Sequence, residues 1–226
     1  PQSLQEAVKS NNAHAGIALD GDADRIVLVD EKGKVVDGDQ ILGALANAWL
    51  KTDELNGGGI VTTIMSNLGL ELYLNSKGLK LCRTHVGDRY VLEYMRQHGY
   101  NLGGEQSGHI ILSDYASTGD GIIAALQILS IALAEGKSIS DVTCLFDPVP
   151  QLLRNIKVKD ANKFDDTILR SISETAEKQI GKRGRVLIRK SGTEQVLRIM
   201  VESEDEVLML KPVSYTHLTL PTINWV

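Results

Sequence analysis

Hydrophobic positions in the first two thirds of the chain alternate between the period of strands and the period of helices. Short apolar runs at residues 15–19, 26–30 and 60–64 are typical of strands. At 40–50 and 88–98 the apolar residues recur every three or four positions, which is typical of amphipathic helices. The same reasoning predicts strands at 35–36, 79–83 and 109–112 and helices at 68–76 and 120–134. This order favours a layered α/β organisation.

A second, smaller unit follows Pro148 and Pro150, because two prolines so close together interrupt regular structure and mark a boundary. Its predicted elements are a strand at 152–158, a helix at 164–179 and strands at 185–189 and 196–201. This order indicates an α+β domain. Residues 212–226 fit neither an amphipathic helix nor a charged surface, and we interpret them as a non-native tail, with a native edge strand as the alternative.

Composition narrows the class of protein. The chain has 226 residues, a formal net charge of −5 and 42% hydrophobic residues, which is ordinary for a soluble protein. It contains no apolar run that approaches a membrane span and no secretory leader, and its acidic balance argues against a nucleic-acid partner. Cys82 and Cys144 lack metal-ligand spacing, so we expect reduced thiols and a cytoplasmic location. Because the chain begins at Pro1 in helix-like sequence, we interpret it as a fragment.

Three aspartates on alternate positions, Asp20, Asp22 and Asp24, directly follow the apolar run at 16–19. A strand would deliver them to a loop, where three like charges repel one another unless a cation holds them. Mg²⁺ is the natural cation for ligands that are all oxygen atoms, and it usually keeps positions open for phosphate oxygens. The pattern therefore predicts a magnesium site and phosphate chemistry.

Taken by itself, this acidic loop admits three other interpretations. A calcium-binding loop would use the aspartates together with Glu31 at position twelve, but Arg25 replaces the glycine needed at position six. A phosphatase of the haloacid-dehalogenase type would use Asp20 as nucleophile and Asp22 as acid, but it does not predict the loops described next. The remaining interpretation is a solvated acidic turn.

A glycine-rich segment at 103–108 is the second candidate loop. Its glycines would let the backbone approach a ligand, and Glu105 and Ser107, on alternate positions, can point the same way. A carboxylate beside a hydroxyl suits the paired hydroxyls of a sugar ring. His109 is the best nearby group for proton transfer. A β-turn with a capped glutamate is the structural alternative.

The third candidate loop lies between two predicted strands near the end of the chain. Arg189, Ser191, Gly192 and Thr193 are followed by Arg198 on the next strand. Hydroxyls, exposed amides and guanidinium groups make a phosphate cradle, and arginine donates two parallel hydrogen bonds to phosphate. An ordinary polar hairpin turn is the alternative.

A weaker segment lies at 85–90. Arg89 could extend a positively charged lining, but Asp88 is more simply interpreted as the cap of the helix that follows.

The three loops in this order resemble those of the α-D-phosphohexomutase superfamily, and most closely its phosphoglucosamine mutase branch. The likeness runs from about residue 13 to residue 206. The segments that carry it are 20–25, 36–40, 65–70, 86–91, 104–109, 118–121 and 184–194. Each segment is a weak signal, but their joint occurrence at family-like spacing is specific.

The resemblance implies a division of the chain into parts of a four-domain protein. Residues 1–35 would be the end of domain 2, with the metal loop, and 36–147 would be domain 3, with the sugar-binding loop. Residues 148–211 would be a truncated domain 4, with the phosphate-binding loop, and 212–226 the non-native tail. The implied fold is α/β, with layered mixed-sheet domains followed by a smaller α+β domain.

The resemblance also implies an activity and a role for each loop. These enzymes are intramolecular phosphotransferases that interconvert glucosamine 6-phosphate and glucosamine 1-phosphate through a phosphoserine and a bisphosphorylated sugar, for UDP-N-acetylglucosamine synthesis. Asp20, Asp22 and Asp24 would hold Mg²⁺, while Arg25 and His109 would be catalytic. The substrate-binding residues would be Glu105, Ser107, Arg189, Ser191, Gly192, Thr193 and Arg198.

Two departures qualify the resemblance. No segment matches the phosphoserine loop, so we expect this chain to be inactive alone, and Gln195 stands where the family commonly has proline. The expected partner is a hexosamine phosphate, with a homodimer also possible and no membrane or nucleic acid. The alternatives are a phosphomannomutase or phosphoglucomutase and a non-catalytic sugar-phosphate-binding module.

Overall fold

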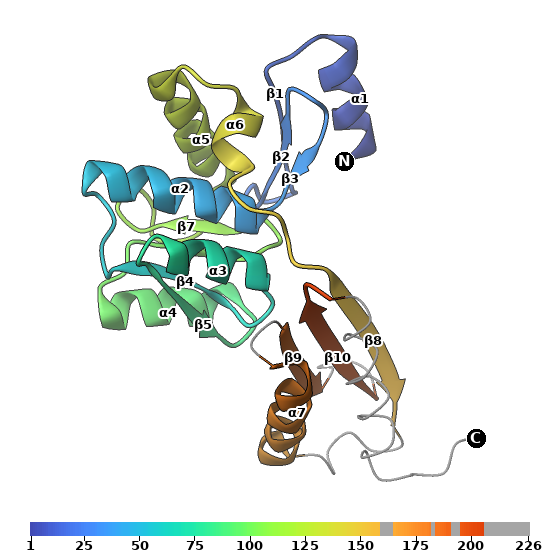
Figure 1. The fold of residues 1–226 in the computed structure, drawn as a ribbon. Coiled ribbons are helices and arrows are strands. Elements are labelled where there is room, and N and C mark those ends of the chain that lie inside the picture. The colour runs from blue at the N-terminus through green and yellow to red at the C-terminus, as the bar shows by residue number, and fades with distance from the viewer. Residues whose placement is uncertain (159–164, 182–183, 191–194, 206–226) are drawn as a thin grey trace. The chain divides into compact units, whose positions relative to one another are not determined.

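Figure 1 shows a computed structural model of the chain, which describes residues 1–158, 165–181, 184–190 and 195–205. The chain divides into two compact units, Pro1–Asp147 and Pro148–Val226, and each is described by itself. Ser191, Gly192 and Thr193 of the expected phosphate loop lie outside the described residues, as does the segment 212–226.

The first unit begins with a helix on a small antiparallel sheet. Helix α1 (Gln2–Ser10) precedes strands β1 (Ala15–Leu19), β2 (Ile26–Asp30) and β3 (Val35–Val36), which pair in the order β1-β2-β3. The β1–β2 register runs from Ala15 opposite Asp30 to Leu19 opposite Ile26. The three predicted strands are therefore confirmed, and the acidic residues 20–25 form the connection between β1 and β2.

A four-stranded mixed sheet follows, with β5 (Lys80–Thr84), β4 (Gly59–Thr63), β6 (Leu102–Gly104) and β7 (Ile110–Leu112) side by side in that order. Strand β4 is parallel to β5 and β6, whereas β7 is antiparallel to β6. Parallel strands need crossover connections, which helices provide here.

Helices cover both faces of this sheet (Figure 1). Helices α2 (Gly38–Thr52), α3 (Leu68–Ser76) and α5 (Gly121–Glu135) lie on one face and α4 (Asp88–His98) on the other, while α6 (Ile139–Thr143) packs against α2 and α5. Ile60 belongs to the large core with α2, α3 and α5, whereas its neighbour Val61 packs with Val91 and Met95 of α4. Because successive strand residues face opposite sides, the result is the predicted layered α/β arrangement.

One prediction about the second loop was wrong in detail. Gly103 and Gly104 belong to strand β6 and not to the loop. A Cβ atom at Gly103 would lie 2.6 Å from the sulfur of Met95 and 2.8 Å from the carbonyl oxygen of Val61. The absence of a side chain there serves the close packing of α4 on the sheet.

The second unit is an α+β arrangement, as predicted. Strands β8 (Gln151–Lys157), β10 (Val196–Ser203) and β9 (Gly184–Lys190) form an antiparallel sheet in that order, and helix α7 (Asp166–Ile180) packs on it. In the part of the chain that the structure describes, we find no helix long and apolar enough to cross a membrane.

Candidate functional site

The acidic loop is a tight turn between two strands. The side chain of Asp20 accepts a hydrogen bond from the backbone N–H of Arg25 (3.2 Å), and the Asp20 carbonyl accepts one from Ala23 (3.2 Å). Ala23 adopts a left-handed conformation with φ of 60°. Calcium loops of the type considered above lie between helices, so the strands β1 and β2 on either side exclude that interpretation.

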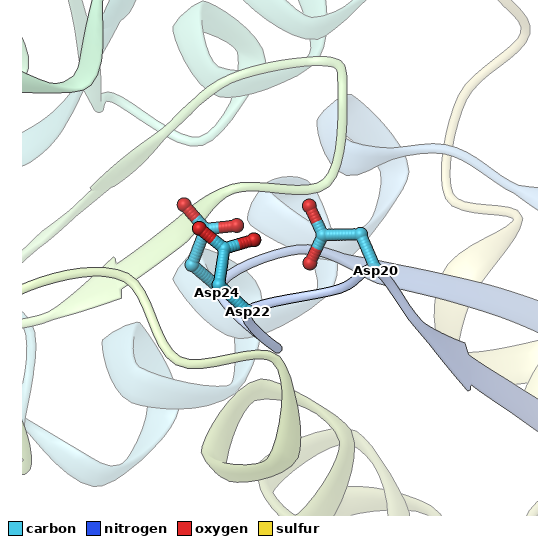
Figure 2. Close-up of side chains that lie close together, drawn as sticks. All are labelled: Asp20, Asp22 and Asp24. Atoms are coloured by element: carbon cyan, nitrogen blue, oxygen red, sulfur yellow. The ribbon is translucent and has the colours of Figure 1, made fainter.

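The three aspartates converge on one point. Figure 2 shows Asp20 pointing toward the carboxylates of Asp22 and Asp24, and one oxygen atom of each lies within 4.8 Å of the others. Asp24 Oδ1 is buried and has no hydrogen-bond partner among the described residues. A buried carboxylate oxygen without a partner is costly, and a cation would satisfy it. The donor set, all carboxylate oxygens, fits Mg²⁺.

Arg25 closes the acidic loop and remains accessible. Its Nε atom lies 3.9 Å from Asp20 Oδ2, and its side chain is 53% exposed. Such a long, exposed ion pair holds the guanidinium only weakly. Arg25 can therefore reach an anion beside the aspartates.

The structure brings the second loop against the first. Arg25 and His109 form an isolated antiparallel bridge, and the N–H of Ile26 donates to the carbonyl of Gly108 (3.1 Å). His109 Nδ1 lies 3.1 Å from Asp24 Oδ2. The loop that we predicted to bind metal and the loop that we predicted to bind sugar are thus one site, within the first unit.

The side chain of His109, which we predicted to transfer a proton, is more deeply buried than that role suggests. Its side chain is 3% exposed, and Nε2 has no hydrogen-bond partner among the described residues, with Asp88 Oδ2 3.8 Å away. A Cβ atom on Gly119 would overlap Nε2, so the imidazole packs directly on the backbone there. The ring orientation is therefore fixed on two sides.

Glu105 and Ser107 lie side by side, as the sequence predicted. Ser107 Oγ donates to Glu105 Oε2 (3.3 Å), and the backbone N–H of Gly87 donates to Glu105 Oε1 (3.1 Å). Backbone bonds from Glu105 N to the His109 carbonyl (2.9 Å) and from Gly108 N to the Glu105 carbonyl (3.0 Å) shape the turn. The carboxylate is thereby held in one orientation.

The prediction that Asp88 caps helix α4 was wrong. The N-cap is Gly87, and no side chain makes a capping hydrogen bond there. Asp88 is instead the first helical residue, with a side chain that is 58% exposed and directed at His109. Arg89 pairs with Glu93 (2.8 Å) one turn along the same helix.

In the second unit, the structure places Arg189 and Arg198 directly opposite each other on β9 and β10. Burial lowers the pKa of Arg189 from its ordinary value, and the positive charge of Arg198 lowers it further. Two guanidinium groups on neighbouring strands repel each other, and an anion bound between them would relieve the repulsion. The unit by itself therefore has the charge arrangement expected of a phosphate site.

Comparison with protein-family models gives two matches in consecutive segments. Residues 37–148 match the phosphoglucomutase/phosphomannomutase alpha/beta/alpha domain III, and residues 153–211 match the C-terminal domain of the same family. The chain belongs to the phosphoglucomutase/phosphomannomutase family. The layered part of the first unit, from residue 37 on, and the α+β second unit correspond to these two family domains, whereas α1 and the sheet β1-β2-β3 lie outside both matches.

Two proteins whose sequences are similar to this chain are named phosphoglucosamine mutase. The protein from Brucella anthropi is 53% identical over 95% of this chain, and that from Rhizobium leguminosarum is 52% identical over 91%. The chain covers 48% and 46% of those relatives, so it spans about half their length.

Solved structures of other family members share the fold at low sequence identity. A phosphoglucomutase/phosphomannomutase family protein from Burkholderia thailandensis matches with a TM-score of 0.78 and 21% identity, covering 97% of this chain and 49% of that one. An Aspergillus fumigatus N-acetylphosphoglucosamine mutase, solved with GlcNAc-6P and magnesium, matches with a TM-score of 0.71 and 21% identity, over 89% of this chain and 50% of that one.

Proposed function

We propose that this chain is part of a Mg²⁺-dependent phosphoglucosamine mutase, which interconverts glucosamine 6-phosphate and glucosamine 1-phosphate. One observation carries the proposal: the aspartate loop and the Glu105–His109 loop meet in one site through the contact of Asp24 with His109. The name shared by relatives that are 52–53% identical supports the choice of substrate. In this proposal the serine that carries the phosphoryl group lies outside this chain, which spans about half the length of the relatives.

In this proposal Asp20, Asp22 and Asp24 hold Mg²⁺. When bound, the ion would supply positive charge that offsets the negative charge of the phosphoryl group. Arg25 orients the same group, because its exposed guanidinium lies beside the aspartates and can donate two parallel hydrogen bonds. In-line phosphoryl transfer depends mainly on positioning and charge neutralisation, and this set of side chains provides both.

Glu105 and Ser107 bind hydroxyl groups of the hexose in the same proposal. Their mutual hydrogen bond and the Gly87 amide hold the carboxylate ready to accept from a sugar. His109 moves a proton at Nε2, the ring nitrogen that lacks a hydrogen-bond partner among the described residues, while its Nδ1 faces Asp24.

Arg189 and Arg198, together with Ser191, Gly192 and Thr193, bind the phosphate that is not reacting. The support is the cross-strand pairing of the two arginines, whose like charges favour a bound anion. We also propose a cytoplasmic location, supported by two free cysteines. The homodimer and the division at residues 35 and 147 into remnants of domains 2, 3 and 4 stay predictions.

The test is an assay of the whole protein, at the length of its relatives, with glucosamine 6-phosphate and Mg²⁺. We expect production of glucosamine 1-phosphate, loss of at least about 100-fold in kcat for Asp22→Asn, and no change for Glu6→Gln on the exposed face of α1. The 226-residue chain alone should be inactive. A strong preference for mannose or glucose phosphates would overturn the choice of substrate, and binding without turnover would overturn the proposed reaction.

A further inference from the structure

Asp88 is a carboxylate in the candidate site to which the proposed function gives no role. It begins helix α4, forms no capping bond, and its exposed side chain lies 3.8 Å from the buried Nε2 of His109. No other contact of this carboxylate is found in the described part of the chain. An acidic residue in a first turn is favoured by the helix dipole, and this carboxylate also stays exposed beside the candidate site, where it can meet a ligand.

The start of helix α4, where Asp88 lies, is in contact with the loop that we propose binds the sugar. Gly87, the residue before it, donates its amide to Glu105 and adopts φ of 129°, a conformation that side chains disfavour. A glycine there lets the amide turn toward Glu105, and Asp88 follows directly. Asp88 therefore follows directly after the residue whose amide holds Glu105, and its own carboxylate lies beside His109 at the end of the same loop.

The negative charges of Asp88 and Glu105 favour a ligand that carries a positive charge over a neutral sugar. The guanidinium of Arg89, the next residue along α4, is paired with Glu93 (2.8 Å) and not with Asp88 or Glu105. A phosphate cannot be their ligand, because like charges repel. A hydroxyl would give each carboxylate one neutral donor, whereas an ammonium group gives charge-assisted hydrogen bonds, which are about twice as strong.

We propose that Asp88 binds the ammonium group of an amino sugar phosphate and thereby determines the preference for a 2-amino hexose over a 2-hydroxy hexose. This inference rests on the proposed function, since it assumes that a hexose phosphate occupies the Glu105 loop. Asp88 touches the substrate in this role, through the ammonium group of the sugar.

The experiment compares Asp88→Asn with unaltered whole protein on glucosamine 6-phosphate and glucose 6-phosphate, by kcat/KM and by equilibrium binding. Asparagine keeps the shape of the side chain and removes its charge. We expect kcat/KM and affinity for glucosamine 6-phosphate to fall about 10- to 100-fold, and those for glucose 6-phosphate to change by less than about threefold. Asp53→Asn is the matched control, because it makes the same change at an exposed carboxylate at the end of α2 and should change neither substrate.

Equal losses on both substrates would overturn the proposal, because Asp88 would then act through His109. Unchanged selectivity would overturn it as well. If the unaltered protein turned over neither sugar, the proposed function would be overturned. The equilibrium binding of the two sugar phosphates would then still test the role of Asp88. Selective loss of glucosamine 6-phosphate binding would support it, and equal binding would overturn it.

Discussion

The imidazole Nδ1 of His109 lies 3.1 Å from Asp24 Oδ2, although 85 positions separate the two residues in the sequence. This contact and the backbone bridge between Arg25 and His109 fix the second loop against the first. One oxygen of the Asp24 carboxylate thus contacts the histidine, and the other has no partner among the described residues. Carboxylates that bind metals are usually held by a second residue in this way.

The first prediction concerns that contact. His109→Gln should weaken binding of Mn²⁺, used as a spectroscopic substitute for Mg²⁺, by about 10-fold or more, because partners of metal ligands typically contribute that much to affinity. Electron paramagnetic resonance of the 226-residue chain would measure free Mn²⁺. His14→Gln, at an exposed position, is the control and should leave the affinity unchanged. Equal affinity in both variants would mean that the contact does not orient Asp24.

The second prediction uses the packing of Gly119 on the His109 ring. A methyl group at Gly119 would overlap Nε2, so Gly119→Ala must displace the imidazole. We expect a loss of about 1–3 kcal/mol in the free energy of unfolding, measured by urea denaturation, and weaker Mn²⁺ binding. Gly21→Ala is the control for stability, since no atom lies within 4 Å of the position that its added methyl group would take. Equal stability of the two variants would contradict the packing argument.

The elements that form the site could be predicted from local patterns, whereas its contacts could not. The strands around the acidic loop follow from apolar runs that end in polar turns, and they have the predicted bounds, 15–19 and 26–30. Helix α6 was missed because its five residues are too short to show a period. The approach of His109 to Asp24 depends on the packing of distant strands, for which no local signal exists.

Asp88 shows how a shift of one residue changes an interpretation. An aspartate before a helical pattern is usually a cap, and the sequence offered no reason to prefer Gly87. Because the helix begins one position earlier than a capping Asp88 requires, the carboxylate is directed at His109 and makes no bond to the helix backbone. The buried Asp39 was likewise invisible to the sequence pattern, since it stands in a helix start that would ordinarily be exposed.

The third prediction concerns pH and Asp39. Burial raises the pKa of this carboxyl group from 3.8 to about 7, partly offset by hydrogen bonds from the Asn67 amide and Ser66. The folded state therefore binds a proton that the unfolded chain has lost, and this contribution to stability is fully present below pH 3.8 and is lost as the pH rises through about 7. The free energy of unfolding should therefore fall by an amount on the order of a few kcal/mol between about pH 4 and pH 7, and thermal unfolding should show Tm falling over the same range.

Asp39→Asn tests this assignment, because the amide resembles the protonated carboxyl group and does not titrate. The variant should lack this part of the pH dependence and should gain stability relative to the unaltered chain above about pH 7. Asp53→Asn, at an exposed helix end, is the matched control and should retain the full pH dependence. An unchanged pH profile in Asp39→Asn would assign the effect to other groups.

The fourth prediction concerns the arginine pair of the second unit. Arg198→Met should weaken binding of inorganic phosphate to the 226-residue chain by about 10-fold or more, because it removes one charged donor from the pair on β9 and β10. Phosphate titration followed by amide chemical shifts of the two strands would measure the affinity.

Arg170→Met is the control, since that arginine is paired with Glu174 on the exposed surface of α7. The like charge of Arg198 lowers the pKa of Arg189 in the absence of an anion, so its removal relieves repulsion and should leave the sheet folded. If Arg198→Met and Arg170→Met bound phosphate equally well, the anion would not lie between the two arginines.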